Sequence, residues 1–229
     1  MGLRLGDTAP DFEAETSQGP INFHEYIKDS WALLFSHPDD FTPVCTTELS
    51  AVALSSADFK SRGVKLIGLS ANDVDSHQGW IKDIDALTNG ADPLNFPIIA
   101  DKDRKISVLY DMLDHQDATN VDAKGQPFTV RSVFVIDPAQ KIRLTLTYPA
   151  STGRNFPEIL RVIDSLQLGD KYKVTTPANW RTPGGTDKVI VHPAVQGEKV
   201  KELFGDDVEV VYPYLRFTSD PSKKKEKAQ

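Results

Sequence analysis

Apolar and polar positions along this chain follow the periods of strands and helices in turn. Five short runs rich in β-branched, leucine and aromatic residues predict buried strands. They span residues 31–36, 64–70, 96–100, 132–136 and 141–148. Apolar residues that recur at helical spacing predict four helices between and after these strands. The first helix begins after Thr42, and the second begins after a cap at Asn72 or Asp73. The other two span residues 103–112 and 158–166.

The order of these elements indicates the fold class. Three strand–helix pairs come first, followed by a β-hairpin with its turn at residues 137–140 and by a last helix. This order is typical of an α/β fold with a mixed central sheet and helices on both faces, which is the thioredoxin-like arrangement. A polar stretch that opens with residues 8–12 predicts a short additional hairpin near the N-terminus. We assign residues 1–170 to this domain.

The periodic pattern stops at residues 175–185, which are rich in proline and glycine. Beyond them we predict a strand, a short amphipathic helix and two extended segments, at 188–191, 198–204, 208–212 and 214–217. We therefore expect a small C-terminal α+β domain over residues 171–229. It has too few core positions to fold alone, so it should pack on the main domain or on a partner subunit. The lysine-rich end, residues 223–227, is expected to be solvated and disordered.

Composition narrows the functional classes. The chain has 229 residues, of which 39% are hydrophobic and 26% charged, as in an ordinary globular protein. A net charge of −7 disfavours nucleic-acid binding, and no apolar run reaches the roughly 18 residues of a membrane span. The N-terminus lacks the apolar core of a signal peptide. One cysteine excludes an internal disulfide and fits a reducing compartment. We expect the cytoplasm, or the mitochondrion if a presequence has been removed.

The single cysteine, Cys45, stands at the start of the first long predicted helix. Thr42 is a favourable N-cap and Pro43 suits the first helical position, so that Cys45 is the third residue. Free backbone N–H groups and the positive end of the helix dipole favour an anion there, and the thiolate is the nucleophilic form of cysteine. A lone cysteine is more often a small buried apolar residue. A merely structural cysteine, however, has no need of this strand–proline–threonine–helix context.

The pattern Pro38-x-x-x-Thr42-x-x-Cys45, within the longer run 36–49, resembles the peroxiredoxins and their one-cysteine, peroxiredoxin-6-like branch. The resemblance covers nearly the whole chain, including the turn that opens the family's C-terminal domain. Its further matching segments are Asp114 and residues 131–135, 148–156 and 176–180. The resemblance implies a thiol-dependent peroxidase that reduces hydrogen peroxide and organic hydroperoxides through a sulfenic acid on Cys45.

Peroxide cleavage requires an ionised sulfur, two oxygens held in line with it and a stabilised leaving oxygen. The Thr42 hydroxyl and the Cys45 backbone N–H can donate toward the bound oxygens. Pro38 would shield the sulfur from water and has no backbone N–H of its own. An arginine, which is always charged, is wanted beside both the sulfur and the peroxide. The resemblance assigns this role to Arg131, for which a surface ion pair is the alternative.

The resemblance also implies three supporting residues. Glu48 and Arg154 would form a network that orients Arg131, and His37 would lie beside the pocket. We expect His37 to bridge water to the thiol, to position the reducing partner, or to be a structural residue with neither role. The five histidines show no pair at metal-ligand spacing, and no glycine-rich phosphate loop is present. Neither a metal nor a cofactor is therefore expected.

The lack of a second cysteine means that the sulfenic acid must be reduced from outside the chain. Glutathione, a thioredoxin-like protein and ascorbate are the candidate reductants, and the sequence does not choose among them. The resemblance further implies a homodimer with a two-fold interface. In such a dimer the C-terminal segment reaches across to the second subunit and helps to wall its Cys45 pocket.

A phospholipase activity would be an alternative or additional function of this chain. Some relatives in this branch carry a phospholipase A2 activity assigned to a serine, a histidine and an aspartate, and Ser30 and His24 match two of those positions. Ser30 lacks the flanking glycines of a nucleophile elbow. The matching acid position holds Ala139, with Asp137 two residues earlier.

Two other classes of protein remain as alternatives. A thioredoxin-like holdase or redox-sensing binding protein would keep the fold but would not need Thr42, Cys45 and Arg131 together. A Cys–His hydrolase would need an oxyanion hole and an acid–base partner for acyl transfer, for which no residues stand out. A peroxide-consumption assay with and without the Cys45 thiol separates all of these classes.

Overall fold

The computed structural model describes residues 2–88, 90 and 93–226. Its contacts divide the chain into two compact units, with the division between Phe156 and Pro157. The elements of the first unit are β1 Glu13–Ala14, β2 Ile21–Asn22, α1 Phe23–Ile27, β3 Trp31–Ser36, α2 Pro43–Leu54, α3 Ser56–Ser61, β4 Val64–Ser70, α4 Val74–Leu87, β5 Ile98–Ala100, α5 Lys105–Leu109, β6 Arg131–Ile136 and β7 Ile142–Tyr148. The domain boundary that we place after residue 170 stays a prediction.

A five-stranded mixed sheet forms the centre of the first unit, in the order β5-β4-β3-β6-β7. Strands β3, β4 and β5 are parallel, with Leu34 opposite Ile67, whereas β6 and β7 are antiparallel to their neighbours. The turn between β6 and β7 closes because the N–H of Gln140 donates to the carbonyl of Asp137. The predicted thioredoxin-like sheet, including its C-terminal hairpin, is confirmed.

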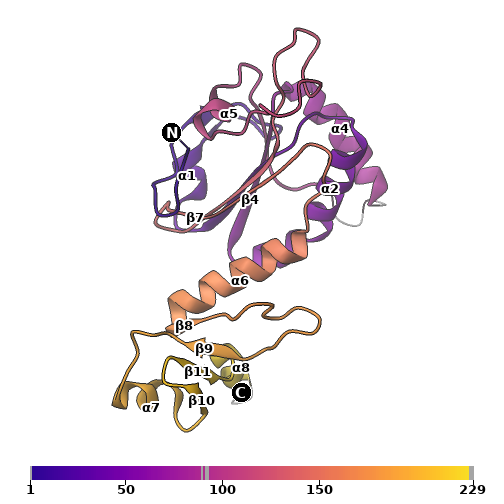
Figure 1. The fold of residues 1–229 in the computed structure, drawn as a ribbon. Coiled ribbons are helices and arrows are strands. Elements are labelled where there is room, and N and C mark those ends of the chain that lie inside the picture. Colours follow the sequence, from indigo (N-terminus) through magenta and orange to yellow (C-terminus); the bar gives the residue numbers. More distant parts are fainter. Residues whose placement is uncertain (1, 89, 91–92, 227–229) are drawn as a thin grey trace. The chain divides into compact units, whose positions relative to one another are not determined.

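The two faces of the sheet carry different helices (Figure 1). Ala32 and Leu34 of β3 belong to a core cluster with Phe23 of α1 and Ile106 of α5. Side chains alternate along a strand, so Leu33 and Phe35 point to the opposite face. There α2 and α4 lie, joined by a hydrogen bond from the Trp80 indole to the hydroxyl of Thr46. The helix that carries the cysteine therefore covers one face only.

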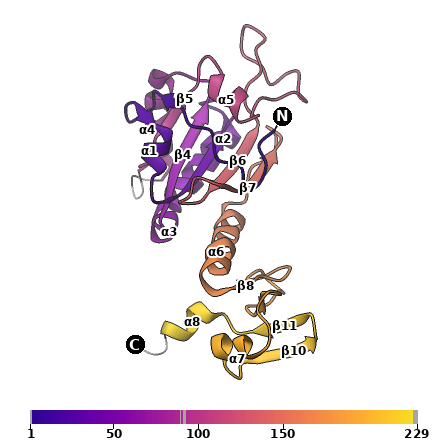
Figure 2. The same cartoon turned by 90° about the vertical axis from the view of Figure 1, so that its left-hand side faces the viewer.

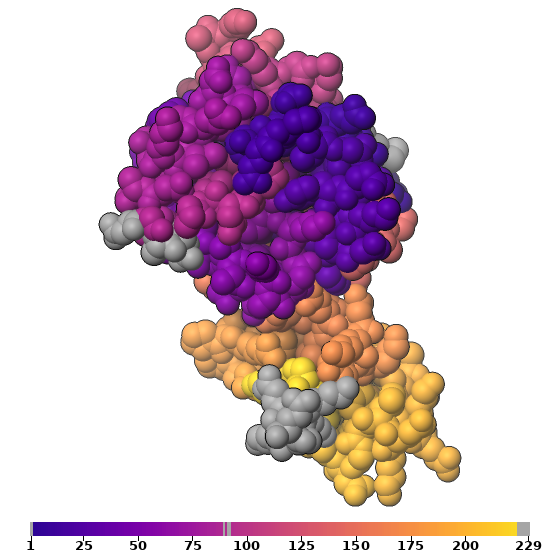
Figure 3. Space-filling model, turned by 180° about the vertical axis from the view of Figure 1, so that it is seen from behind, coloured from indigo at the N-terminus to yellow at the C-terminus, as the bar shows by residue number. Residues whose placement is uncertain are grey.

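The N-terminal segment lies on the surface of the first unit (Figure 3). Its short hairpin pairs Glu13 with Asn22 in antiparallel register, as the polar opening of the chain predicts. Isolated bridges fasten the segment to the main sheet, one from Thr8 to Lys141 and one from Thr16 to Ile99.

One predicted helix is much shorter than expected. The pattern predicts residues 103–112, but α5 spans only Lys105–Leu109. Arg104 before it adopts a left-handed conformation, with φ of 60°, and the carboxylate of Asp101 accepts the backbone N–H groups of Ile106 and Ser107. This acceptor fixes the start of the helix two residues later than the pattern predicts.

The second unit contains an antiparallel sheet in the order β10-β11-β9-β8, and its hairpin β10–β11 lies beside α7 (Figure 2). Its elements are α6 Phe156–Tyr172, whose first residue belongs to the first unit, then β8 Val174–Thr175, β9 Val189–Val191, α7 Glu198–Phe204, β10 Val208–Tyr212, β11 Leu215–Thr218 and α8 Pro221–Glu226. Helix α6 is longer than the predicted 158–166, because its apolar pattern continues to Leu168 in the core of this unit.

Two expectations about the C-terminal segment need correction. Its apolar groups do not all require cover from outside, because this unit has a core of its own. The members of this core are Leu168, Val174, Trp180, Val189, Val191, Val195 and Phe204. Residues 223–226, expected to be disordered, lie in α8, where Asp220 accepts the N–H of Ser222 through its side chain. Residue 227 lies outside the described residues.

Candidate active site

Cys45 occupies the predicted position in the first turn of α2. Thr42 is the N-cap in extended backbone conformation, Pro43 is the first helical residue, and the Cys45 side chain is completely buried. The Thr42 side chain makes no capping hydrogen bond. Its hydroxyl donates instead to the carbonyl of Asp39 at 2.9 Å. The side chain of Thr42 thus does not cap the first N–H groups of α2. These groups can donate hydrogen bonds to an anion instead.

Arg131 opens β6 and reaches the cysteine. Its Nη1 lies 3.4 Å from Cys45 Sγ and 2.7 Å from Glu48 Oε2. Its Nε and Nη2 both donate to the carbonyl of Ala150, at 2.9 and 2.6 Å. These contacts hold the guanidinium in one orientation, and only 2% of the residue is exposed. The alternative of a surface ion pair is therefore wrong.

Glu48 joins two arginines in one buried network. It lies on the same helix as Cys45 and accepts the backbone N–H of Arg154 and its Nε through Oε1, and the Arg154 Nη2 through Oε2. Arg154 also donates to the carbonyl of Ser132. Burial raises the pKa of Glu48, but the charges and hydrogen bonds of Arg154 and the charge of Arg131 outweigh it and hold this pKa below its ordinary value. Glu48 is therefore ionised at neutral pH.

The charges around the sulfur do not cancel without the thiolate. Arg131 and Arg154 carry two positive charges, and Glu48 supplies one negative charge, all three in side chains that are nearly excluded from solvent. A buried net positive charge is costly, and an anion beside it lowers that cost. Cys45 Sγ is in contact with this cluster. A negative charge that develops beside the sulfur, such as that of a leaving oxygen, is therefore stabilised here.

Pro38 and His37 lie in the connection between β3 and α2. Pro38 is buried, as expected of a residue that excludes water. His37 is completely buried, packs against the ring of Trp80 and bonds through Nε2 to Asp40 Oδ1 at 2.8 Å. Burial lowers the pKa of His37, against the opposing effect of Asp40.

Two residues of this neighbourhood, Asp40 and His77, are not predicted as site residues from the sequence. The His77 ring on α4 bonds through Nδ1 to Asp40 Oδ2 at 2.7 Å, so the donor and acceptor atoms of His37, Asp40 and His77 lie within 4.8 Å of one another. The available signal was the apolar face of the predicted helix, on which His77 and Trp80 stand three positions apart.

The residues of the phospholipase alternative are not arranged as a catalytic pair. The Ser30 hydroxyl donates to the carbonyl of Ile27 at 2.8 Å, and His24 Nε2 donates to the carbonyl of Ala9 at 2.7 Å. Each side chain is thus engaged with a different backbone group. A general base for Ser30 would have to face its hydroxyl.

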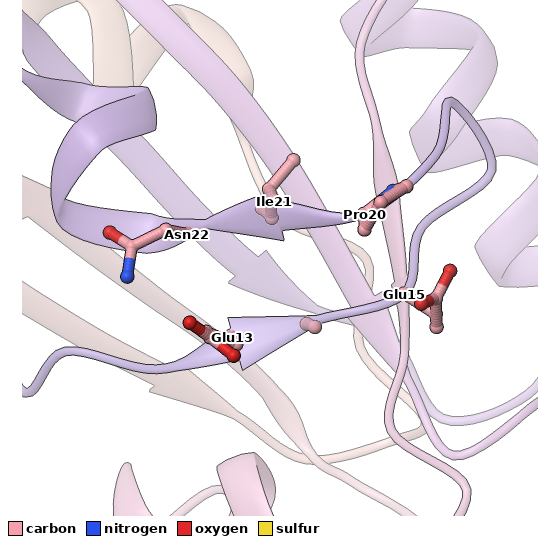
Figure 4. Close-up of a pocket in the computed structure, with 6 residues that line it drawn as sticks. Glu13, Glu15, Pro20, Ile21 and Asn22 are labelled. Atoms are coloured by element: carbon pink, nitrogen blue, oxygen red, sulfur yellow. The ribbon is translucent and has the colours of Figure 1, made fainter.

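A surface pocket lies on the hairpin β1–β2 (Figure 4). Its lining residues are Glu13, Ala14, Glu15, Pro20, Ile21 and Asn22. They offer carboxylates but no thiol, hydroxyl or cation, so peroxide chemistry is better placed at Cys45.

A thioredoxin-like fold with a buried cysteine at a helix N-terminus, held against an Arg–Glu–Arg cluster, defines the class of thiol peroxidases. The chain matches the AhpC/TSA family over residues 5–145 and the C-terminal domain of 1-Cys peroxiredoxin over residues 165–206. It therefore belongs to the one-cysteine peroxiredoxins of the AhpC/TSA family, and it is a peroxidase.

Individual relatives agree over almost the full length. The chain is 52% identical to a mitochondrial peroxiredoxin of Saccharomyces cerevisiae, covering 94% of this chain and 80% of that one. It is 50% identical to peroxiredoxin-6 of Gallus gallus, covering 96% and 99%. A solved structure of a mutant peroxiredoxin 6 from Arenicola marina superposes with a TM-score of 0.89 at 47% identity, covering 96% of this chain and 99% of that one.

Among the described residues, no helix is both long enough and apolar enough to cross a membrane.

Proposed function

We propose that this enzyme reduces hydrogen peroxide and organic hydroperoxides at Cys45. The thiolate attacks one peroxide oxygen, the O–O bond breaks, and the sulfur keeps the attacked oxygen as a sulfenic acid. The other oxygen leaves with the bonding electrons as hydroxide or alkoxide and then takes a proton. The observation that carries this proposal is the buried net positive charge of the cluster formed by Arg131, Glu48 and Arg154, in contact with Cys45 Sγ.

The role of Thr42 differs in detail from the expectation that its hydroxyl donates to the peroxide. That hydroxyl proton is already directed to the carbonyl of Asp39, so the oxygen presents its lone pairs to the pocket. In our proposal Thr42 accepts the O–H of the peroxide, while N–H groups of α2 and Arg131 donate to the oxygens. Pro38, which is buried in the loop before α2, keeps water from the sulfur in this proposal.

We further propose an external thiol as the reductant. Cys45 is the only cysteine, so no disulfide within one chain can form. One solved structure is that of a yeast mitochondrial 1-Cys peroxiredoxin, whose thiol-resolving mechanism is described as acting via glutathione/thioredoxin systems. It is 50% identical to this chain, with a TM-score of 0.83, and covers 94% of this chain and 99% of that one. Because Cys45 is completely buried, either thiol reaches the sulfur only after a local rearrangement around it.

A single turnover tests the proposed cycle. Protein oxidised with one equivalent of peroxide in the absence of thiols should carry a sulfenic acid that a dimedone-type reagent traps on Cys45, as mass spectrometry would show. The oxidised protein should run as a monomer on a denaturing, non-reducing gel, because no second thiol is available. Excess peroxide should yield the sulfinic acid, which ordinary thiols do not reverse. Stoichiometric disulfide-linked dimers would contradict the proposal, since they would have to join two copies of Cys45.

The homodimer implied by the resemblance is also part of the proposal. In the second unit, Val210, Tyr212 and Tyr214 are between 53% and 78% exposed, although they are large and apolar. The rings of Tyr212 and Tyr214 stack at 5.4 Å between centroids. A second copy of this chain is the occupant to which we assign this surface, because apolar side chains on a hairpin gain by burial in a two-fold interface.

Removing the apolar groups from that hairpin should weaken the dimer. The triple variant Val210→Ser, Tyr212→Ser and Tyr214→Ser should sediment as a monomer at micromolar concentration where the wild type sediments as a dimer. Lys199→Ser on α7, an exposed polar position of the same unit, serves as the control and should stay dimeric. A wild type that is monomeric in analytical ultracentrifugation would refute the dimer, and a dimeric triple variant would refute this surface.

We propose a reducing compartment for this enzyme, since its chemistry depends on a free thiol. The cytoplasm remains our first assignment. One of the similar proteins is named mitochondrial, so the mitochondrion is the second.

A further inference from the structure

Two histidines and one aspartate form a buried hydrogen-bonded chain beside the cysteine-bearing helix. Asp40 accepts from His37 Nε2 through Oδ1, and its Oδ2 faces His77 Nδ1 at 2.7 Å. The other nitrogen of His77, Nε2, faces the carbonyl of Ile99 at 3.1 Å. The side chains of all three ionisable residues are completely shielded from solvent. No step of the peroxidase cycle described above uses Asp40 or His77.

The partners of this chain fix where its protons are. A carbonyl oxygen only accepts, so His77 Nε2 carries a proton. A carboxylate also only accepts, so His77 Nδ1 and His37 Nε2 carry protons as well. Burial raises the pKa of Asp40, but its hydrogen bonds to both histidines outweigh this effect and lower the pKa overall, which supports the ionised form. His77 is then an imidazolium paired with the Asp40 carboxylate.

His37 is left in a single tautomer. Its Nε2–H is directed to Asp40, and its Nδ1 is buried without a hydrogen-bond partner in the described structure. Protonation of Nδ1 would add a second buried positive charge with no acceptor, which is costly. His37 therefore presents an unprotonated ring nitrogen, Nδ1, inside the protein. It does so only while the Asp40 carboxylate keeps the proton of His37 on Nε2.

The same aspartate anchors the loop that carries Pro38 and Thr42. Its Oδ2 also accepts the hydroxyl of Ser76 on α4, and its backbone N–H donates to the side chain of Asn72. Within this loop Phe41 has a left-handed backbone, with φ of 54°, a conformation that non-glycine residues avoid. Such a conformation persists where surrounding contacts determine it, and the contacts of Asp40 supply them directly before the N-cap of α2.

We propose that Asp40 and His77 are positioning residues of peroxide reduction, in which a His77 imidazolium holds the Asp40 carboxylate, and this carboxylate fixes both the tautomer of His37 and the loop that carries Pro38 and Thr42. The inference rests on the proposed function for its effect on the rate. The proton positions themselves do not depend on it.

The contacts within this cluster have the lengths of hydrogen bonds and are shorter than the spacing of zinc ligands. Ligands of a tetrahedral zinc site about 2.0–2.1 Å from the metal are separated by roughly 3.3 Å. The contacts between Asp40 and the two histidines are 2.7 and 2.8 Å, which are the lengths of hydrogen bonds that contain a proton. Both His77 nitrogens are also engaged.

The proton positions can be observed in the wild-type protein. Long-range ¹H–¹⁵N spectra at pH 7, assigned with single histidine substitutions, should show His77 protonated on both ring nitrogens and His37 protonated on Nε2 alone. A neutral His77, or a His37 protonated on Nδ1, would overturn the proposal. This measurement needs no activity, so it fails or succeeds independently of the peroxidase mechanism.

Two substitutions of His77 separate positioning from simple packing. In His77→Asn the amide nitrogen can replace Nδ1 and still donate to Asp40, whereas in His77→Gln it replaces Nε2 and donates only to Ile99. We expect His77→Gln to lower the second-order rate constant with peroxide by about tenfold, and His77→Asn to stay within about threefold of wild type, as for loss and retention of a buried hydrogen bond to a charge. His115→Asn, at an exposed histidine, is the control and should leave the rate unchanged.

Which of the two His77 variants loses more of the rate constant decides between the explanations. A greater loss in His77→Asn than in His77→Gln would assign the effect to the contact with Ile99, and equal wild-type rates in both would remove any positioning role. If His77→Gln does not fold, the wild-type spectra still decide, because a neutral His77 contradicts the proposal by itself.

Discussion

Replacing Cys45 with serine should reduce peroxide consumption to the rate of buffer alone, while the protein stays folded. The hydroxyl is nearly isosteric with the thiol but does not ionise, so it supplies neither the nucleophile nor the negative charge that the Arg–Glu–Arg cluster lacks. Peroxide loss should be followed by stopped-flow or electrode assay with an external thiol present. Circular dichroism should show an unchanged spectrum.

The position of the thiol, and not its presence, should decide activity. The double variant Cys45→Ser, Thr47→Cys keeps one thiol in the first turns of α2 at an exposed position. It should react with peroxide only as fast as an ordinary thiol, because its sulfur lacks the contact with Arg131. Activity retained in Cys45→Ser would refute the peroxidase mechanism and leave a binding protein of the same fold as the better interpretation.

Arg131→Met should lower the second-order rate constant with peroxide by about two to three orders of magnitude, as for loss of a preorganised charge stabiliser. The change removes one of two positive charges, so Glu48 and Arg154 cancel and the thiolate is no longer needed for neutrality. Arg131→Lys should recover part of the rate. A lysine restores the charge but cannot contact Cys45, Glu48 and the Ala150 carbonyl together.

A matched arginine outside the site controls for this result. Arg161 pairs with Glu158 three residues earlier in α6, and Arg161→Met should leave the rate constant within about twofold, as for a partly exposed ion pair. Wild-type kinetics in Arg131→Met, with thiolate formation followed by the pH dependence of alkylation, would assign Arg131 a purely structural role.

The sequence allowed the fold to be predicted where burial alone decides it. Strands β3 and β4 are buried on both faces, so each appears as a largely apolar run, interrupted in β4 by Lys65, and their predicted ends agree with the structure. The bounds predicted for helix α5 were too wide, because its start depends on Asp101 and on the left-handed backbone of Arg104. Neither feature belongs to the periodic pattern from which the helix was predicted.

The site was predictable only in its local part. Thr42, Pro43 and Cys45 are neighbours in sequence, and helix-capping preferences alone place the sulfur. Arg131 is 86 residues from Cys45, so its contact with the sulfur came from resemblance and not from the pattern. His77 was missed because it lies 37 residues from Asp40, and a buried histidine on an apolar helix face is usually only part of the core.

The alternation of side chains along the central sheet has a consequence for protein engineering. Ala32, Leu34 and Phe134 face the layer of α1 and α5, whereas Arg131 and Phe35 belong to the opposite layer with Cys45. Libraries designed for thermal tolerance can therefore be directed to the first layer, where repacking changes stability without moving a reacting group. Libraries designed to alter peroxide preference belong in the second. Each trait can be evolved in a separate campaign and the winning substitutions combined afterwards, since distant substitutions are usually additive.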